Sequence, residues 1–192
     1  MPSLERHPLK PFLPSNAKVL MLGSFPPPQK RWSINFFYPN FQNDMWRIMG
    51  TIFFGDKNIF VDSKNKKFHK DAIIQFLEFT GIALYDTAEI VRRLNNNASD
   101  NFLEIVQHTN LQELLQHIPT CKAIVTTGEK ATDAIILRHN AIKPKIGEYS
   151  TINIGAHTLR LYRMPSSSRA YPLALDKKAM YYHEMFKDLD LI

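Results

Sequence analysis

Two short loops carry the residues best suited to chemistry. The first begins with Gly23-Ser24-Phe25-Pro26, directly after an apolar run, and continues through Phe36-Phe37-Tyr38 to Asn43. A glycine after a strand lets a ligand approach the backbone closely, and consecutive aromatic rings offer a stacking face for a planar base. The alternative is that these rings pack inward and only cover the core.

The second loop is Met164-Pro165-Ser166-Ser167-Ser168-Arg169. Three serines directly before a predicted helix supply hydroxyls and free backbone N–H groups, which suit a phosphate at a helix N-terminus. Arg169 adds a positive charge. The alternative interpretation is a plain serine N-cap without a ligand.

The elements that must position these loops alternate between short apolar runs and amphipathic stretches. This pattern predicts a three-layer α/β/α sandwich with a central, mostly parallel, four-stranded sheet. Open α/β sheets bind ligands beyond the carboxyl ends of their strands, so the two loops can converge on one cleft. The expected strands cover residues 18–22, 82–86, 123–126 and 158–163, and the expected helices begin near residues 41, 67, 111, 128 and 175.

Asp86 and the histidines complete the set of polar candidates. Asp86 ends a predicted strand and could line the cleft, cap a helix or bond to Thr87. The seven histidines show no His-Glu-x-x-His or other metal spacing, and one cysteine, Cys121, cannot form a cysteine-ligated zinc or iron–sulfur site within one chain. We therefore expect no metal and no cofactor, and we expect His157 and His183 at the surface or bonded to partners.

Taken together, the two loops resemble the signature motifs of the uracil-DNA glycosylase superfamily. Its members have a strand ending in a Gly-x-x-Pro loop, an aromatic segment leading into Asn-x-Phe-Trp, and a C-terminal strand ending in His-Pro-Ser or a variant. Gly23–Pro26, Asn43–Trp46 and Met164–Ser168 fit this form. The sequence most resembles the hypoxanthine-DNA glycosylase, or mismatch-specific, branch, which has a Gly-Ser-x-Pro loop and a Leu-Pro-Ser-x-Ser motif.

Further segments extend this resemblance from Val19 to about Tyr171. Residues 81–86 resemble the middle segment of that branch, Ala98-Ser99-Asp100 is akin to its Ser-x-Asp loop, and residues 126–131 resemble its Asn-Gly-x-x-Ala turn. The motifs are short, and the resemblance rests on their shared order and spacing.

The resemblance implies a DNA N-glycosylase, which hydrolyses the N-glycosidic bond of a flipped-out deaminated base, uracil or hypoxanthine, in DNA. The catalytic amide of the branch maps to Asn43. The implied base pocket is formed by Gly23, Ser24, Phe25, Pro26, Phe37, Tyr38 and Met164, and the implied DNA-binding residues are Ser166, Ser167, Ser168 and Arg169.

Two departures from the family pattern leave other interpretations open. Ser24, Phe25 and the prolines stand where many members carry an acid or an asparagine for the attacking water, and Met164 replaces the histidine that stabilises the departing base. The alternatives are a non-catalytic module that binds damaged or single-stranded DNA, and a hydrolase of free nucleosides. The sequence does not identify the excised base.

Composition sets the remaining expectations. A chain of 192 residues, 44% of them hydrophobic, suits one globular domain over residues 1–192. A net charge of +6 and a pI near 9.4 favour a polyanionic partner such as DNA. No uncharged apolar run could cross a bilayer, no apolar N-terminal stretch resembles a signal peptide, and one cysteine suits a reducing compartment. We expect a cytoplasmic monomer.

Overall fold

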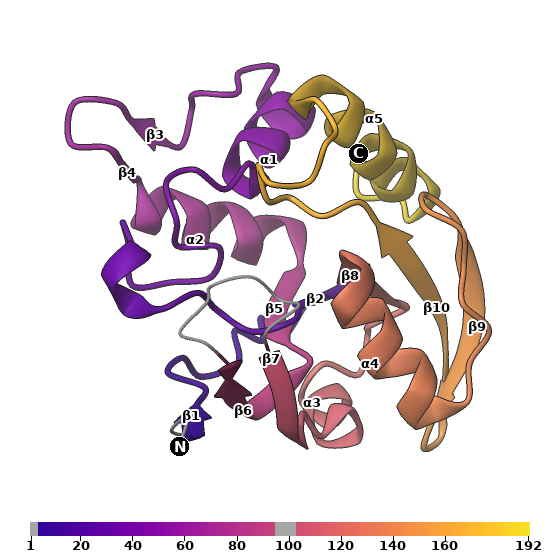
Figure 1. Ribbon diagram of the computed structural model, residues 1–192. Coiled ribbons are helices and arrows are strands. Elements are labelled where there is room, and N and C mark those ends of the chain that lie inside the picture. Colours follow the sequence, from indigo (N-terminus) through magenta and orange to yellow (C-terminus); the bar gives the residue numbers. More distant parts are fainter. Residues whose placement is uncertain (1–3, 95–102) are drawn as a thin grey trace.

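A five-stranded sheet forms the centre of the protein (Figure 1). The computed structural model describes residues 4–94 and 103–192. Four strands run parallel, and the edge strand β9 is antiparallel to β10. Strands β2, β5 and β8 are buried along their whole length, which explains their continuous apolar runs. The sheet order is β5 (Ile82–Asp86), β2 (Val19–Gly23), β8 (Ala123–Thr127), β10 (His157–Met164) and β9 (Tyr149–Ile154).

Helices cover both faces of this sheet. Figure 1 shows α1 (Met45–Phe54), α2 (Lys70–Thr80) and α5 (Leu175–Asp188) on one face. The other face is covered by α3 (Leu111–His117) and α4 (Glu129–His139). The predicted α/β/α sandwich with a mostly parallel sheet is therefore confirmed, but the sheet has five strands rather than four. Strand β9 was not predicted.

A second, three-stranded antiparallel sheet was not predicted either. It has the order β1 (Leu4–Arg6), β6 (Ala88–Arg93) and β7 (Leu103–His108). Strand β6 begins two residues after β5 ends, so the small sheet lies next to the carboxyl end of the central one. The pairing of β1 with β6 brings the N-terminal segment to the same place. The Ala98-Ser99-Asp100 segment of the family resemblance lies outside the described residues.

Several element boundaries differ from the prediction for local reasons. Helix α2 begins at Lys70 because the preceding residues form a short hairpin, β3 (Val61–Asp62) with β4 (Lys67–Phe68). Helix α5 begins at Leu175, so six residues separate it from the last serine of the second loop. The prediction of a phosphate site or serine cap at that helix N-terminus is therefore wrong.

The described residues contain neither a membrane-spanning helix nor a cluster of metal-ligating side chains. No helix in residues 4–94 or 103–192 is long and apolar enough to cross a bilayer. Within the same ranges, no three histidine, cysteine, aspartate or glutamate side chains gather where they could share a metal ion.

Candidate active site

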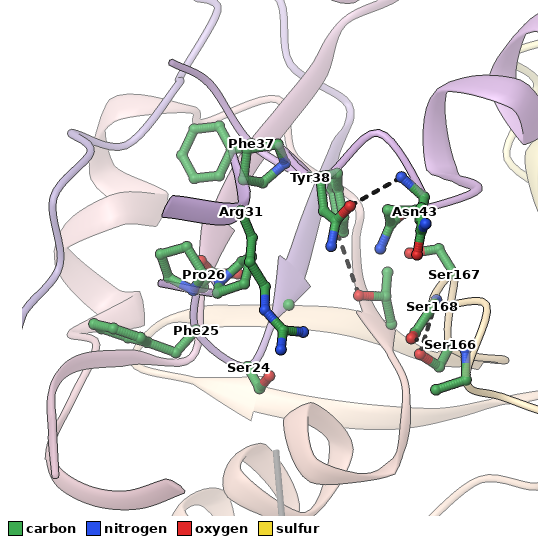
Figure 2. A pocket seen from close by; sticks show the side chains of 18 of the residues that line it. Ser24, Phe25, Pro26, Arg31, Phe37, Tyr38, Asn43, Ser166, Ser167 and Ser168 are labelled. Atoms are coloured by element: carbon green, nitrogen blue, oxygen red, sulfur yellow. Dashed lines mark hydrogen bonds between the residues drawn. The ribbon is translucent and has the colours of Figure 1, made fainter. Parts of the chain in front are cut away.

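A cleft of about 280 Å³ opens at the carboxyl ends of the parallel strands (Figure 2). The last residues of three neighbouring strands, Gly23, Asp86 and Thr127, lie in its lining. The two predicted loops supply most of the rest, so the structure brings together residues about 140 positions apart in sequence. The predicted residues that line the cleft are Gly23, Ser24, Phe25, Pro26, Phe37, Tyr38, Asn43, Ser166, Ser167, Ser168 and Arg169.

Met164 does not join them. It ends β10, its side chain is completely buried in the core, and the residue is absent from the cleft lining. Its predicted place in the base pocket is therefore wrong. An apolar side chain at a central strand end gains more from the core than from a polar cleft.

Backbone hydrogen bonds and a buried ion pair hold the two loops against each other. The Asp44 N–H donates to the Ser167 carbonyl at 2.9 Å, and Asn43 and Ser168 form an isolated antiparallel β-bridge. The Asp44 carboxylate accepts from Lys178 Nζ at 3.2 Å and from Arg169 Nε at 3.0 Å. Lys178 is fully buried and also donates to the Ser168 carbonyl. A buried charge with several partners fixes this junction.

The first loop is also tied to the second sheet. The Arg93 guanidinium donates to the Pro26 carbonyl at 3.1 Å and pairs with Glu5 of β1. The Thr87 N–H donates to the Gly23 carbonyl at 2.8 Å. Contacts to the second sheet and to the serine loop therefore hold the first loop in place, as a pre-organised site requires.

The side-chain amide of Asn43 has two ends with different roles. Its Oδ1 accepts a hydrogen bond at 2.9 Å from the N–H of Met45, the first residue of α1. A backbone N–H can point only at the amide oxygen, so this bond fixes the orientation of the side chain. No described residue bonds to Nδ2, which is left as a donor for a ligand. The side chain of Asn43 can therefore bond to the start of α1 and donate to a ligand at the same time.

The serine loop also presents donors. Ser166 Oγ accepts from the Ser168 N–H, and Ser168 Oγ accepts from the Ala170 N–H, both at 3.2 Å. A hydroxyl that accepts from the backbone keeps its own O–H for another acceptor. Ser167 is almost fully buried, and its carbonyl accepts the hydrogen bond from the Asp44 N–H that joins the two loops. Ser166 and Ser168 are thus better placed than Ser167 to hold an anionic ligand.

The aromatic residues divide between core and cleft. Phe25 is 8% exposed, packs with Ala88, Val91 and Leu103, and points away from Asn43 and the serines in Figure 2. Phe37 is buried in the main core. Both residues belong to the cleft lining, but their rings pack mainly in the apolar clusters behind it.

Tyr38 is the half-buried aromatic residue of the cleft. Its backbone lies in the left-handed region, with φ of 48°, which costs energy for a non-glycine residue and is common at functional sites. The hydroxyl lies 3.3 Å from Thr127 Oγ1. Burial raises the pKa of Tyr38 well above its usual value, so the phenol stays neutral and can donate.

Asp86 and His7 form a buried pair at the cleft floor. His7 Nε2 lies 2.9 Å from Asp86 Oδ2, and the two side chains are 2% and 10% exposed. Asp86 was considered as a cleft residue, a helix cap or a partner of Thr87, and in the structure it lines the cleft. His7 was missed, because a contact across 79 positions depends on the unpredicted pairing of β1 with β6.

Comparison with solved structures finds proteins with the same fold. No family model matches the chain, and no curated protein matches its sequence. The solution NMR structure of a candidate uracil DNA glycosylase from Methanosarcina acetivorans matches with a TM-score of 0.64 and 21% identity. The match covers 98% of this chain and 99% of that one. The two proteins share one fold. At this identity the likeness concerns architecture, so the role of each residue rests on the geometry above.

A second groove continues from the cleft past Arg31. Figure 2 shows Arg31 reaching into the cleft, a residue that sequence reasoning did not select. The groove has a volume of about 770 Å³, and its charged lining residues are all basic. Two of them, Lys66 and Lys67, come from the hairpin of β3 and β4. The lining consists of Lys30, Arg31, Trp32, Ser33, Asn40, Phe41, Gln42, Asn65, Lys66 and Lys67.

Proposed function

We propose that this protein is a DNA N-glycosylase that hydrolyses the N-glycosidic bond of a deaminated base, uracil or hypoxanthine, flipped into the cleft. The observation that carries the proposal is the junction of the two loops. It places the free Nδ2 of Asn43 and the hydroxyls of Ser166 and Ser168 around one small cleft. The shared fold with a candidate uracil DNA glycosylase supports the same conclusion.

The size of the cleft suits one extruded nucleotide. Its volume of about 280 Å³ lies just below the roughly 300–1,000 Å³ typical of small-molecule sites. A base inside a duplex is unreachable, so the enzyme must flip it out, and a deaminated base in a mispair leaves the stack most easily. Arg169 and Ala170, which follow the serines in the cleft lining, are exposed, so the flanking phosphates would lie on that side.

The donors in the cleft match the charge that develops during base release. When the bond between C1′ and the base nitrogen breaks, its electron pair moves to the base. A donor aimed at a base carbonyl stabilises that charge, and one such donor is worth about 2.7–4 kcal/mol of barrier. Asn43 Nδ2 is the donor we assign to the base, and the neutral Tyr38 phenol can assist. The hydroxyls of Ser166 and Ser168 would hold a phosphate.

The basic groove provides a path for the DNA strand beside the flipped nucleotide. Lysine and arginine side chains bind phosphates through charge, and each such contact makes binding more sensitive to salt. Trp32 lies in the groove and donates from Nε1 to the Pro27 carbonyl, which holds its indole next to the first loop. An indole face can stack on an unpaired base.

An oligonucleotide assay tests the proposal. Labelled DNA with a single uracil, hypoxanthine, xanthine or mismatched thymine is incubated with the protein and then treated with alkali. Strand cleavage at uracil or hypoxanthine is the expected result, because base release leaves an alkali-labile abasic site. A mobility shift without cleavage would instead indicate a binding module, and hydrolysis of free nucleosides with intact DNA would indicate a nucleosidase.

A further inference from the structure

The cleft holds one carboxylate that the proposed chemistry has not yet used. Asp86 is the only acidic residue among the described residues that line it. The other ionisable groups of the lining are the arginines and Tyr38, whose raised pKa keeps its phenol protonated. An amide is a poor proton acceptor, and Asn43 Oδ1 is already occupied by the Met45 N–H. Proton acceptance in this cleft therefore falls to Asp86.

The two oxygens of Asp86 have different surroundings. Oδ2 accepts from His7 Nε2, which must carry a proton because a carboxylate only accepts. Oδ1 has no hydrogen-bond partner among the described residues. It lies against the backbone of Gly23, where a Cβ would come within 2.4 Å of it. The glycine at the end of β2 thus leaves room for Oδ1 at the cleft floor.

His7 is held rigidly on its other side. Its Nδ1 accepts a hydrogen bond from the Leu9 N–H at 3.2 Å, and its ring packs against Tyr85 at 4.5 Å and edge-on against Phe25 at 5.3 Å. A buried ring with both nitrogens bonded has one orientation, and it holds the carboxylate in one orientation as well. Phe25, which the resemblance placed in the base pocket, therefore forms part of the wall that supports this pair.

We propose that Asp86 is the general base that activates the attacking water, and that His7 is a positioning residue for it. This inference rests on the proposed glycosylase function. It also accounts for the absence of an acid in the first loop, because the carboxylate comes from the neighbouring strand β5, whose end is paired in register with Gly23.

The reaction balances without a cofactor. The water oxygen forms a bond to C1′ of the deoxyribose, and the bond between C1′ and the base nitrogen breaks. The electron pair of that bond leaves with the base, while the water proton passes to Asp86 Oδ1. The departing base is stabilised by the Asn43 donor and takes a proton from solvent. The carboxylic acid of Asp86 then returns its proton to solvent.

The test measures single-turnover base release and DNA affinity on four proteins. The wild type is compared with Asp86→Asn, which keeps the size and the acceptor for His7, and with Asp86→Ala assayed with and without added formate. Asp71→Asn is the matched control, because it removes an exposed aspartate on α2. Loss of a general base lowers the rate by about 100–10,000-fold. We expect such a loss for both Asp86 variants, near-normal affinity, and a rate that recovers with formate in Asp86→Ala.

Two further variants test the role of His7. His7→Gln keeps an N–H close to the position of Nε2, whereas His7→Leu removes it. Misplacing a catalytic group can cost up to about 100-fold, so we expect a large loss with Leu and a rate within about threefold of wild type with Gln. Equal rates for the two variants would make His7 a packing residue only.

The outcomes separate the inference from the proposed function. A wild type that releases no base from any oligonucleotide overturns both. An active wild type with an Asp86→Asn variant within threefold of its rate overturns the assignment of Asp86 and leaves the glycosylase function standing. If neither Asp86 variant folds, as judged by thermal unfolding, Asp86 is a structural residue and the assignment is also overturned.

Discussion

Replacing Asn43 separates two roles that its amide combines. Asn43→Ala removes the acceptor of the Met45 N–H and the Nδ2 donor together. Losing a cap costs about 0.5–2 kcal/mol of unfolding free energy. Because about 1 kcal/mol shifts Tm by roughly 2–4 °C in a chain of this size, we expect a fall of about 1–8 °C. Losing the donor to the departing base is expected to slow base release by about 100–1,000-fold.

Asn43→Asp separates the two effects. A carboxylate keeps an acceptor for the Met45 N–H, and a negative charge at a helix start is favourable, so Tm should stay near that of the wild type. The donor is lost, however, and a negative charge now faces the electron-rich base. Base release should therefore fall at least as far as in Asn43→Ala. The measurements are single-turnover release and thermal unfolding on both variants.

The matched control is Asn110→Ala. Asn110 is the N-cap of α3, and its side chain accepts from the Glu113 N–H at 3.3 Å, outside the cleft. It should lose a similar amount of stability and no activity. The reasoning is refuted if Asn43→Ala releases base at the wild-type rate while it is destabilised, or if Asn43→Asp is fully active.

Three further predictions follow from packing and charge. Gly23→Ala places a Cβ 2.4 Å from the carboxylate floor of the cleft, so base release should fall while DNA affinity is kept; unchanged single-turnover rates would contradict this. Lys178→Met removes the buried partner of Asp44 and should cost about 3–5 kcal/mol of unfolding free energy in a urea titration, and a cost below 1 kcal/mol would count against the buried pair. Lys67→Ala should weaken DNA binding and reduce the slope of log affinity against log salt by about 1. Lys122 is exposed just before β8, at the opposite end of the sheet, so Lys122→Ala should change neither quantity. Equal effects of the two substitutions would show that the groove does not bind DNA.

The sequence was most informative where one element carries its own pattern. The buried parallel strands showed as continuous apolar runs, so the sandwich and the ends of β2 and β10 could be predicted, and with them the residues of the cleft. The apolar face of α1 could also be predicted, because Met45, Ile48 and Met49 recur at helical spacing. The structure buries all three.

The sequence was least informative where a residue depends on a distant partner. His7 lies in a polar N-terminal segment with no motif, and only the pairing of β1 with β6 brings it to Asp86. Met164 follows the family motif but ends a central strand, and burial decided its position. Phe25 was expected in the base pocket, but its ring packs on the apolar surface that the unpredicted second sheet offers.

Direct detection of the released base tests the central claim most directly. The wild-type protein is incubated with oligonucleotides that contain one uracil or one hypoxanthine, and the free base and the DNA are measured by mass spectrometry. We predict free base and abasic DNA in equal amounts, because hydrolysis of one N-glycosidic bond releases one base and leaves one abasic site. Tight binding to these oligonucleotides with no free base and no change in their mass would contradict the account.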